Sequence, residues 1–164
     1  MNPDLPATST GLTHLDSKGQ AHMVDVADRE LSIRVASASG KVLLSAEVVQ
    51  LLRSGGVPKG DVLATARIAG IMGAKRTPDL IPLCHPIAIH GVRVELEIVD
   101  YGIEIMVSVK TADRTGVEME ALTAVAIAGL TVIDMVKSLD PGAAIHEIQV
   151  ISKDGGRNGN WVRS

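Results

Sequence analysis

The sequence predicts an α+β plait, a fold in which helices pack mainly on one face of an antiparallel sheet. Two neighbouring segments, about 87–99 and 103–109, alternate apolar and polar side chains on either side of a Tyr-Gly turn and therefore predict a β-hairpin. A long apolar helix is predicted at about 116–139, before a final strand. The order strand, helices, hairpin, long helix and strand is typical of such a plait.

The chain of 164 residues is long enough for one domain with its own core, and we expect residues 11–164 to form it. Residues 1–10 contain two prolines and several Ser and Thr residues, which is typical of a flexible N-terminal arm. An alternating stretch around residues 33–38 predicts the first strand, and Ser39 and Gly40 are expected to end it.

Two helices are predicted between the first strand and the hairpin. Ser45 can cap a short helix that the glycine pair 55–56 ends. Asp61 can cap a second helix that continues to about Lys75, where the Thr-Pro pair 77–78 closes it.

The C-terminal part is predicted to contain the long helix, a strand and a tail. The helix is expected to end at the Asp-Pro-Gly segment 140–142, and the last strand is predicted at about 145–151. A glycine-rich tail follows, which we expect to be mobile unless it binds a ligand.

The composition excludes several classes of function. A net charge of -3 argues against a general nucleic-acid binder, and one Tyr and one Trp are too few for RNA recognition by base stacking on the sheet. The single Cys excludes an intrachain disulfide and a multi-Cys metal site. No apolar run reaches the ~20 residues of a membrane span and no signal-peptide pattern is present, so we expect a cytoplasmic protein without membrane or nucleic-acid partners.

The chain contains no Phe, so its core must consist mainly of aliphatic side chains. Small side chains bury less area per residue, and association with further copies would add stability.

One candidate site is the segment 82–86, in which Cys84 and His85 lie between two prolines. Such a rigid loop can hold an imidazole in one orientation, as an active site requires. The alternative is a turn with a buried Cys and a hydrogen-bonded His. Neighbouring side chains usually diverge, so the pair does not predict a thiol nucleophile beside its base.

Both ends of the long helix carry charged side chains. Glu118 and Glu120 lie in its first turn, where they either complement the helix dipole or line a site. Asp134 and Lys137 share a face near its end, as a surface ion pair or as a functional pair. Glu120 and Asp134 are fourteen residues apart, which is about 21 Å along the axis. If both ends serve catalysis, either the substrate is long or another chain completes the site, and we favour the second alternative.

Basic residues beside helix ends and glycines suggest a phosphorylated small-molecule ligand. Lys59 precedes the second helix, whose N-terminus offers a place for phosphate, and Lys75 lies at the other end of that helix. Lys153 begins the glycine-rich tail, where exposed backbone N–H groups can bind an anion. The tail lacks the spacing of a P-loop.

Several segments of the sequence, in this order, resemble the MoaC family, and the resemblance extends from about residue 12 to residue 162. The segments are HMVDV at 22–26, KGDV at 59–62, ATARIAG at 64–70, LCHP at 83–86, GVEMEALT at 116–123, and Asp134-Met135 with Lys137.

The resemblance implies a ferredoxin-like α+β subunit and a homohexamer built as a trimer of dimers, with active sites at the dimer interface. It also implies a lyase of molybdenum-cofactor (molybdopterin) biosynthesis. The implied reaction converts 3′,8-cyclo-7,8-dihydro-GTP into cyclic pyranopterin monophosphate and pyrophosphate. No metal and no other cofactor is expected.

By resemblance, the residues of the site fall into a catalytic set and a substrate-binding set. The catalytic set is Asp134, Lys137 and Lys59, in which the carboxylate can orient a Lys that moves protons. The substrate-binding set is Leu83, Cys84, His85, Glu118, Met119 and Glu120, with Arg67, Lys75 and Lys153 as candidates for contacts with the triphosphate. Arg157 stands where the family commonly has a Lys, and we leave it outside the catalytic set because Arg cannot replace a Lys in proton transfer.

A non-catalytic nucleotide-binding module is the alternative from a different functional class, because a fold does not fix a function. Tight GTP binding without turnover would favour the module, whereas abnormal titration of the Lys-Asp pair would favour the enzyme.

Overall fold

The structure is a computed structural model that describes residues 18–156 and 159–164. The arm predicted for residues 1–10 and the side chain of Arg157 therefore lie outside the described residues.

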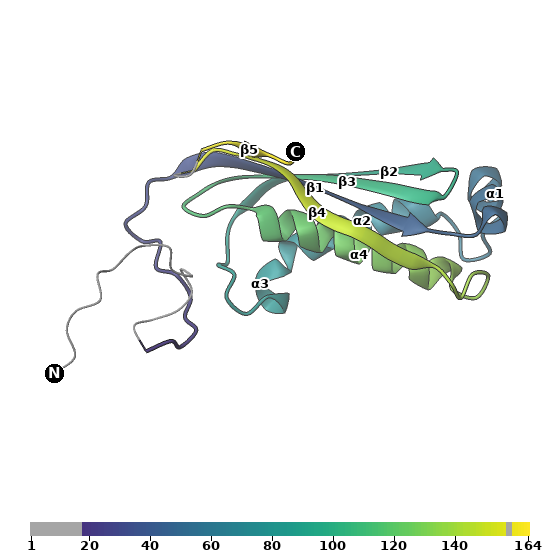
Figure 1. Ribbon diagram of the computed structural model, residues 1–164, viewed down its shortest axis with the longest axis horizontal. Coiled ribbons are helices and arrows are strands. Elements are labelled where there is room, and N and C mark those ends of the chain that lie inside the picture. The colour runs from purple at the N-terminus through teal and green to yellow at the C-terminus, as the bar shows by residue number, and fades with distance from the viewer. Residues whose placement is uncertain (1–17, 157–158) are drawn as a thin grey trace.

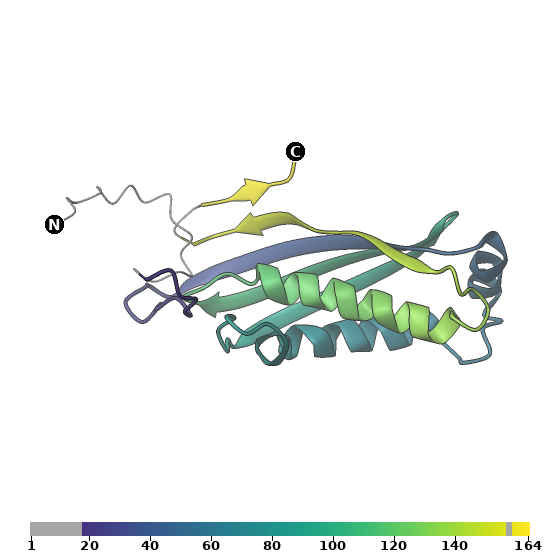
Figure 2. The same ribbon diagram turned by 60° about the horizontal axis from the view of Figure 1, so that its bottom comes forward.

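An antiparallel sheet forms one layer of the molecule and helices form the other (Figure 1). The strands are β1 (Ser32–Leu43), β2 (Ile89–Val99), β3 (Gly102–Asp113), β4 (Ala144–Asp154) and β5 (Trp161–Val162), in the spatial order β2-β3-β1-β4-β5. The helices are α1 (Ala46–Ser54), α2 (Val62–Lys75), α3 (Thr77–Leu80) and α4 (Glu118–Val136). Helices α2 and α4 lie side by side on one face of the sheet (Figure 2). The predicted α+β, ferredoxin-like plait is confirmed.

The caps predicted for the first two helices are present. Ser45 accepts a hydrogen bond from the Val48 backbone N–H, and Gly55 ends α1 in the left-handed conformation with φ of 69°. Asp61 accepts a hydrogen bond of 2.9 Å from the Ala64 backbone N–H at the start of α2. The Thr-Pro pair at 77–78 ends α2 as predicted but also begins the short helix α3, because proline in a first helical turn loses no backbone hydrogen bond.

The prediction that β1 ends at Ser39 and Gly40 is wrong, because the strand continues to Leu43. Gly40 pairs with Ile105 of β3 inside the sheet. A Cβ atom at Gly40 would lie 2.6 Å from Cγ1 of Val125 on α4. The glycine therefore does not break the strand but gives α4 room to approach the sheet.

The predicted mobile tail is also partly wrong. Lys153 lies within β4, which extends to Asp154, and the short strand β5 pairs with it through Trp161 opposite Lys153. Strand β5 has only two residues, so the sequence carries no period that could reveal it.

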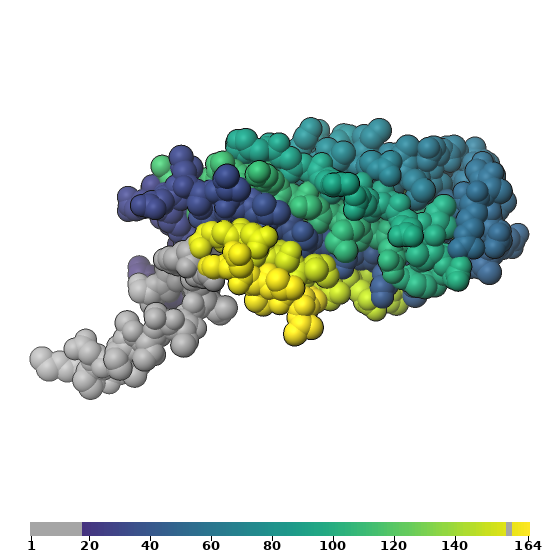
Figure 3. Space-filling model, turned by 90° about the horizontal axis from the view of Figure 1, so that it is seen from above, coloured from purple at the N-terminus to yellow at the C-terminus, as the bar shows by residue number. Residues whose placement is uncertain are grey.

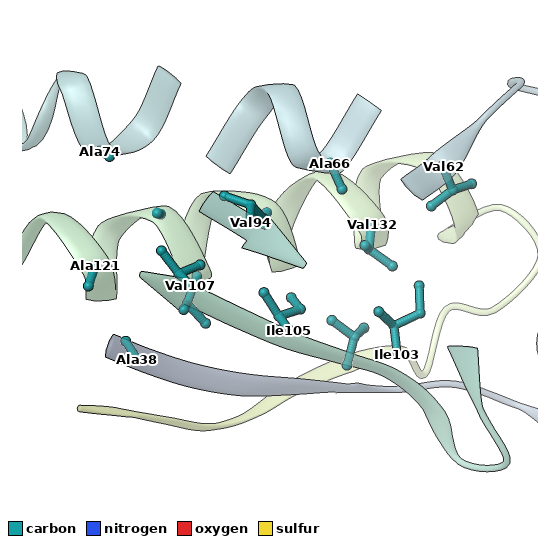
Figure 4. Close-up of a cluster of buried hydrophobic side chains, with 14 of the residues drawn as sticks. Ala38, Val62, Ala66, Ala74, Val94, Ile103, Ile105, Val107, Ala121 and Val132 are labelled. Carbon is teal, nitrogen blue, oxygen red and sulfur yellow. The ribbon is translucent and has the colours of Figure 1, made fainter. Parts of the chain in front are cut away.

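The core between the sheet and the helices is aliphatic, as the absence of Phe requires (Figure 4). Helix α4 is long and apolar enough to span a membrane, but its side chains pack against β1, β3 and β4, as in the core helix of a soluble protein. Helices α2 and α4 touch closely at Gly73, where a Cβ atom would lie 2.8 Å from Cγ1 of Ile127. This packing fixes the position of both ends of α4.

Candidate active site

A cavity of about 380 Å³ lies at the start of α4. Its lining includes all six residues of the predicted substrate-binding set that come from segments 83–85 and 118–120: Leu83, Cys84, His85, Glu118, Met119 and Glu120. The structure therefore brings together two segments that are more than thirty residues apart in the sequence.

Glu120 is the buried ionisable group of this cavity, with only 3% of its surface exposed. Burial, and to a lesser degree the neighbouring charge of Glu118, raises the pKa of Glu120 to about 7. At neutral pH this carboxyl group can therefore donate or accept a proton.

The Cys84 thiol lies in the same cavity. Burial raises its pKa, and the charge of Glu120 raises it further. A thiol of raised pKa is a poor nucleophile at neutral pH, so the surroundings of Cys84 favour a packing and binding role.

His85 connects the cavity to the segment that precedes β1. Its Nε2 atom lies 2.6 Å from the carbonyl oxygen of Val24. Because a carbonyl can only accept, Nε2 carries the hydrogen. The same segment is held a second time by Arg114, whose Nε atom donates to the Arg29 carbonyl oxygen at 2.9 Å. Val24 and Arg29 both line the cavity.

A smaller cavity of about 140 Å³ shares Arg29, Gly116 and Glu118 with the first and adds further basic groups. These are Arg34 and Lys153, and the Lys153 ammonium lies 3.4 Å from a Glu118 carboxylate oxygen. Sequence reasoning identified Lys153 but missed Arg29 and Arg34. Their only signal in the sequence was their nearness to the segment 22–26, because neither belongs to a motif.

The predicted catalytic set lies together at the other end of α4. Lys137 Nζ donates to a carboxylate oxygen of Asp134 at 2.8 Å. Lys59 Nζ donates to the backbone carbonyl of Asp134 at 2.6 Å and lies 3.5 Å from its second carboxylate oxygen. The hydrogen bond from Lys137, followed by the charges of both lysines, lowers the pKa of Asp134 below its ordinary value. All three side chains are exposed, so a ligand or another chain can reach them.

One chain does not bring the residues of the cavity at the start of α4 and the cluster of Lys59, Asp134 and Lys137 into a single site. Glu120 and Asp134 are fourteen residues apart on α4, a helix that rises ~1.5 Å per residue. Arg67 lines neither of the two cavities at the start of α4. Its Nε atom donates to the carbonyl oxygen of Val94 in β2, an edge strand of the sheet. Lys75 is exposed in the last turn of α2 and lines neither cavity.

Among residues 18–156 and 159–164, no three His, Cys, Asp or Glu side chains are arranged to hold a metal ion.

Comparison with known proteins shows that this sequence is similar to those of enzymes of one kind. A sequence model of the MoaC family matches residues 23–156. A protein of Streptomyces avermitilis named cyclic pyranopterin monophosphate synthase is 61% identical over 97% of this chain and 94% of its own length. Cyclic pyranopterin monophosphate synthase 2 of Mycobacterium bovis is 56% identical over 93% of this chain and 91% of its own length. A synthase of the same name from Thermomicrobium roseum is 57% identical over 93% of both chains.

The family match covers most of the chain, and it contains every residue of the two groups at the ends of α4. The chain belongs to the MoaC family.

Proposed function

We propose that this protein is a cyclic pyranopterin monophosphate synthase, a lyase of molybdenum-cofactor biosynthesis. Its substrate would be 3′,8-cyclo-7,8-dihydro-GTP, and its products cyclic pyranopterin monophosphate and pyrophosphate. Family membership and the names of relatives up to 61% identical to this chain support the proposal.

The observation that carries the proposal is the pairing of a ligand-sized cavity with an acid-base cluster. The cavity contains Glu120, a carboxyl group with a pKa near neutrality. Such a group can hydrogen-bond the purine-derived rings of the substrate in either protonation state. The cluster of Lys59, Asp134 and Lys137 supplies the proton donors and acceptors that opening and rebuilding a ring requires.

The smaller cavity is suited to the triphosphate. Arg29, Arg34 and Lys153 bring three cations to its walls, against the carboxylates of Glu118 and Asp154. In the last step, a substrate hydroxyl oxygen gives up its proton to a base of the acid-base cluster and attacks the α-phosphorus, and the bond from that phosphorus to the bridging oxygen breaks. Pyrophosphate then leaves with the electrons of that bond, and the cations offset its charge.

We further propose that two chains build each site, so that the acid-base cluster of one chain meets the cavity of another. The separation of the two groups along α4 supports this arrangement. Apolar side chains on the outer surface of the helical layer support it too, because Ile68, Met72 and Leu130 are each more than half exposed. Three such dimers would form a hexamer that acts in the cytoplasm. In this proposal residues 11–164 form one catalytic domain, and the reaction needs no metal or other cofactor.

The direct test is to incubate the purified protein with anaerobically prepared 3′,8-cyclo-7,8-dihydro-GTP and to follow both products by mass spectrometry. Release of cyclic pyranopterin monophosphate together with pyrophosphate is expected. Intact substrate in the presence of folded, assembled protein would contradict the proposal and would favour a nucleotide-binding module instead.

A further inference from the structure

The segment that precedes β1 carries Arg29 to the two cavities at the start of α4. Figure 3 shows this segment in dark purple at one end of the molecule, close to the yellow C-terminal part of the chain. Residues 22–31 form neither helix nor strand, so no ladder of backbone hydrogen bonds fixes their position. Within the segment, the Arg29 backbone N–H donates to the Val26 carbonyl oxygen at 3.1 Å. Such a local bond shapes a turn, whose position then depends on contacts with the rest of the fold.

Arg114 makes a contact of this kind from the residue that follows β3. Its Nε atom donates to the Arg29 carbonyl oxygen at 2.9 Å, although the two residues are 85 positions apart in the sequence. Both side chains are partly buried. Because the hydrogen bond ends on the backbone of Arg29, it fixes the point from which the Arg29 side chain reaches the cavities.

The same corner of the fold holds a second cation of the smaller cavity. The Arg34 Nε atom donates to the carbonyl oxygen of Asp113, the neighbour of Arg114, at 3.0 Å. The backbone at Gly156 lies against the Arg34 guanidinium so closely that a Cβ atom there would clash with it. Asp113 and Arg114 therefore hold two of the three cations, Arg29 and Arg34, that line the smaller cavity.

Arg114 itself stands behind the cavity walls. In the described part of the chain it lines neither of the two cavities, whereas Arg29 lines both. Recognition of phosphate by a guanidinium depends on the placement of its donors. A shift of the Arg29 backbone would therefore weaken binding of an anion without any change in the number of cations at the walls.

We propose that Arg114 is a positioning residue for the triphosphate, which holds Arg29 at the cavity through the hydrogen bond from Nε. The inference rests on the proposed function, because it takes the smaller cavity as the triphosphate site. It differs from a role of charge, in which the Arg114 guanidinium would attract the triphosphate from outside the cavity.

Two substitutions separate the role of position from the role of charge. In Arg114→Gln the side-chain amide nitrogen takes the place of Nε, so the donor is kept and the charge is lost. In Arg114→Lys a methylene group takes that place, so the charge is kept and the donor at that point is lost. A positioning role predicts that Arg114→Gln preserves the site better than Arg114→Lys, and a role of charge predicts the opposite order.

Titration calorimetry with inorganic tripolyphosphate measures the site without turnover. Arg114→Lys should raise the Kd for tripolyphosphate about 10-fold, as expected for the loss of one hydrogen bond to a charged group, and Arg114→Gln should stay within about twofold of the unaltered protein. Hydrogen exchange at the backbone amides of residues 24–30 should be faster in Arg114→Lys than in Arg114→Gln, because the segment loses its anchor. A role of charge would not produce this difference in exchange.

A double-mutant cycle tests whether Arg114 acts through Arg29. Arg29→Ala removes the guanidinium but keeps the backbone carbonyl that Arg114 binds. In that background Arg114→Lys should have little further effect on the Kd for tripolyphosphate. Independent effects of the two substitutions would overturn the inference.

The matched control is Arg93→Gln, which removes one positive charge on the open face of the sheet, the face that points away from the helices. It should leave the Kd unchanged. Weaker binding by Arg114→Gln than by Arg114→Lys would overturn the inference, as would equal binding by both variants and the unaltered protein. If Arg114→Lys does not fold, loss of tripolyphosphate binding by folded Arg114→Gln is sufficient to overturn it.

The probe also separates this inference from the proposed activity. Failure of the unaltered protein to bind tripolyphosphate would overturn the inference, even if the protein releases cyclic pyranopterin monophosphate. Binding of tripolyphosphate with the expected order of variants, but without conversion of 3′,8-cyclo-7,8-dihydro-GTP, would contradict the proposed activity alone.

Discussion

At the scale of single residues, Glu120 shows how burial changes the chemistry of a side chain. Its carboxyl group lies in the first turn of α4 at 3% exposure, beside a second carboxylate. An exposed Glu in the same turn would simply favour the positive end of the helix dipole. Because Glu120 is buried, its neutral form is favoured and its proton becomes exchangeable near neutral pH.

The raised pKa of Glu120 predicts a pH-dependent stability. Below about pH 4.5 the group is protonated in both the folded and the unfolded protein. Between about pH 4.5 and 7 only the unfolded protein loses the proton, so the free energy of unfolding falls as pH rises. We expect a fall of roughly 2 kcal/mol, allowing for water in the cavity. Urea unfolding at fixed protein concentration should show this fall in the unaltered protein and not in Glu120→Gln, and parallel pH profiles of the two would contradict the prediction.

Asp134 is the opposite case, an exposed carboxylate that two lysines keep ionised. Replacing Lys137 by Ala removes the hydrogen bond of 2.8 Å to that carboxylate. Turnover should fall about 100-fold or more, since one acid-base group contributes on that order. The pKa of Asp134, measured by NMR, should rise towards its ordinary value.

The matched control for Lys137→Ala is Arg93→Ala, which removes the exposed ion pair of 2.8 Å with Glu95 on the face of β2 that points away from the helices. It should leave turnover unchanged. Full turnover by folded Lys137→Ala protein would remove Lys137 from the catalytic set.

At the scale of elements, close approach of α4 to its neighbours positions the cavity at one end and the acid-base cluster at the other. Gly40 of β1 faces Val125, and Gly73 of α2 faces Ile127. Both contacts need a residue without a Cβ atom, because both neighbours are β-branched and stiff. Small residues therefore set the distance between the layers of the fold.

Two strand glycines allow this role to be tested. Gly40→Ala would place a Cβ atom 2.6 Å from Val125 and should lower the free energy of unfolding by roughly 2 kcal/mol. Gly91→Ala on β2 has its nearest neighbour, Lys110 Cβ, at 4.0 Å and should change stability by less than about 0.5 kcal/mol. Urea unfolding of both variants at one protein concentration makes the comparison, and equal stabilities would show that α4 can shift to accommodate the methyl group.

At the scale of the whole molecule, the chain presents two unlike surfaces. The helical layer carries the two halves of the proposed site and exposed apolar side chains such as Ile68 and Leu130. The open face of the sheet carries charges of both signs, among them Arg93, Lys110 and Glu104.

A site shared between chains predicts that inactive variants restore each other. Glu120→Ala alters the cavity and Lys137→Ala the acid-base cluster, so a mixed dimer contains one site with both changes and one with neither. After random exchange of subunits, an equimolar mixture should recover about a quarter of full turnover. Subunit exchange is verified by native mass spectrometry with one isotope-labelled variant. Exchange without any recovered turnover would contradict a shared site.

The sequence by itself determined the elements whose signals are local. The caps at Ser45 and Asp61 and the alternation of the hairpin depend on residues a few positions apart, and the structure confirms them. The MoaC segments likewise predicted the residues that gather at both ends of α4. These features were predictable because a hydrogen-bonded cap or a two-residue period is complete within a short stretch of chain.

Only the tertiary structure decided the features that need contacts between distant segments. The continuation of β1 through Gly40 depends on its pairing with β3, and the pairing of β5 depends on β4. Arg34 joins Lys153 because β1 and β4 are neighbours in the sheet, and Arg29 joins them from the turn before β1. The pKa of Glu120 depends on the burial that the fold imposes. Burial and the convergence of charges depend on distances in space, and a sequence records these distances only through the fold that it adopts.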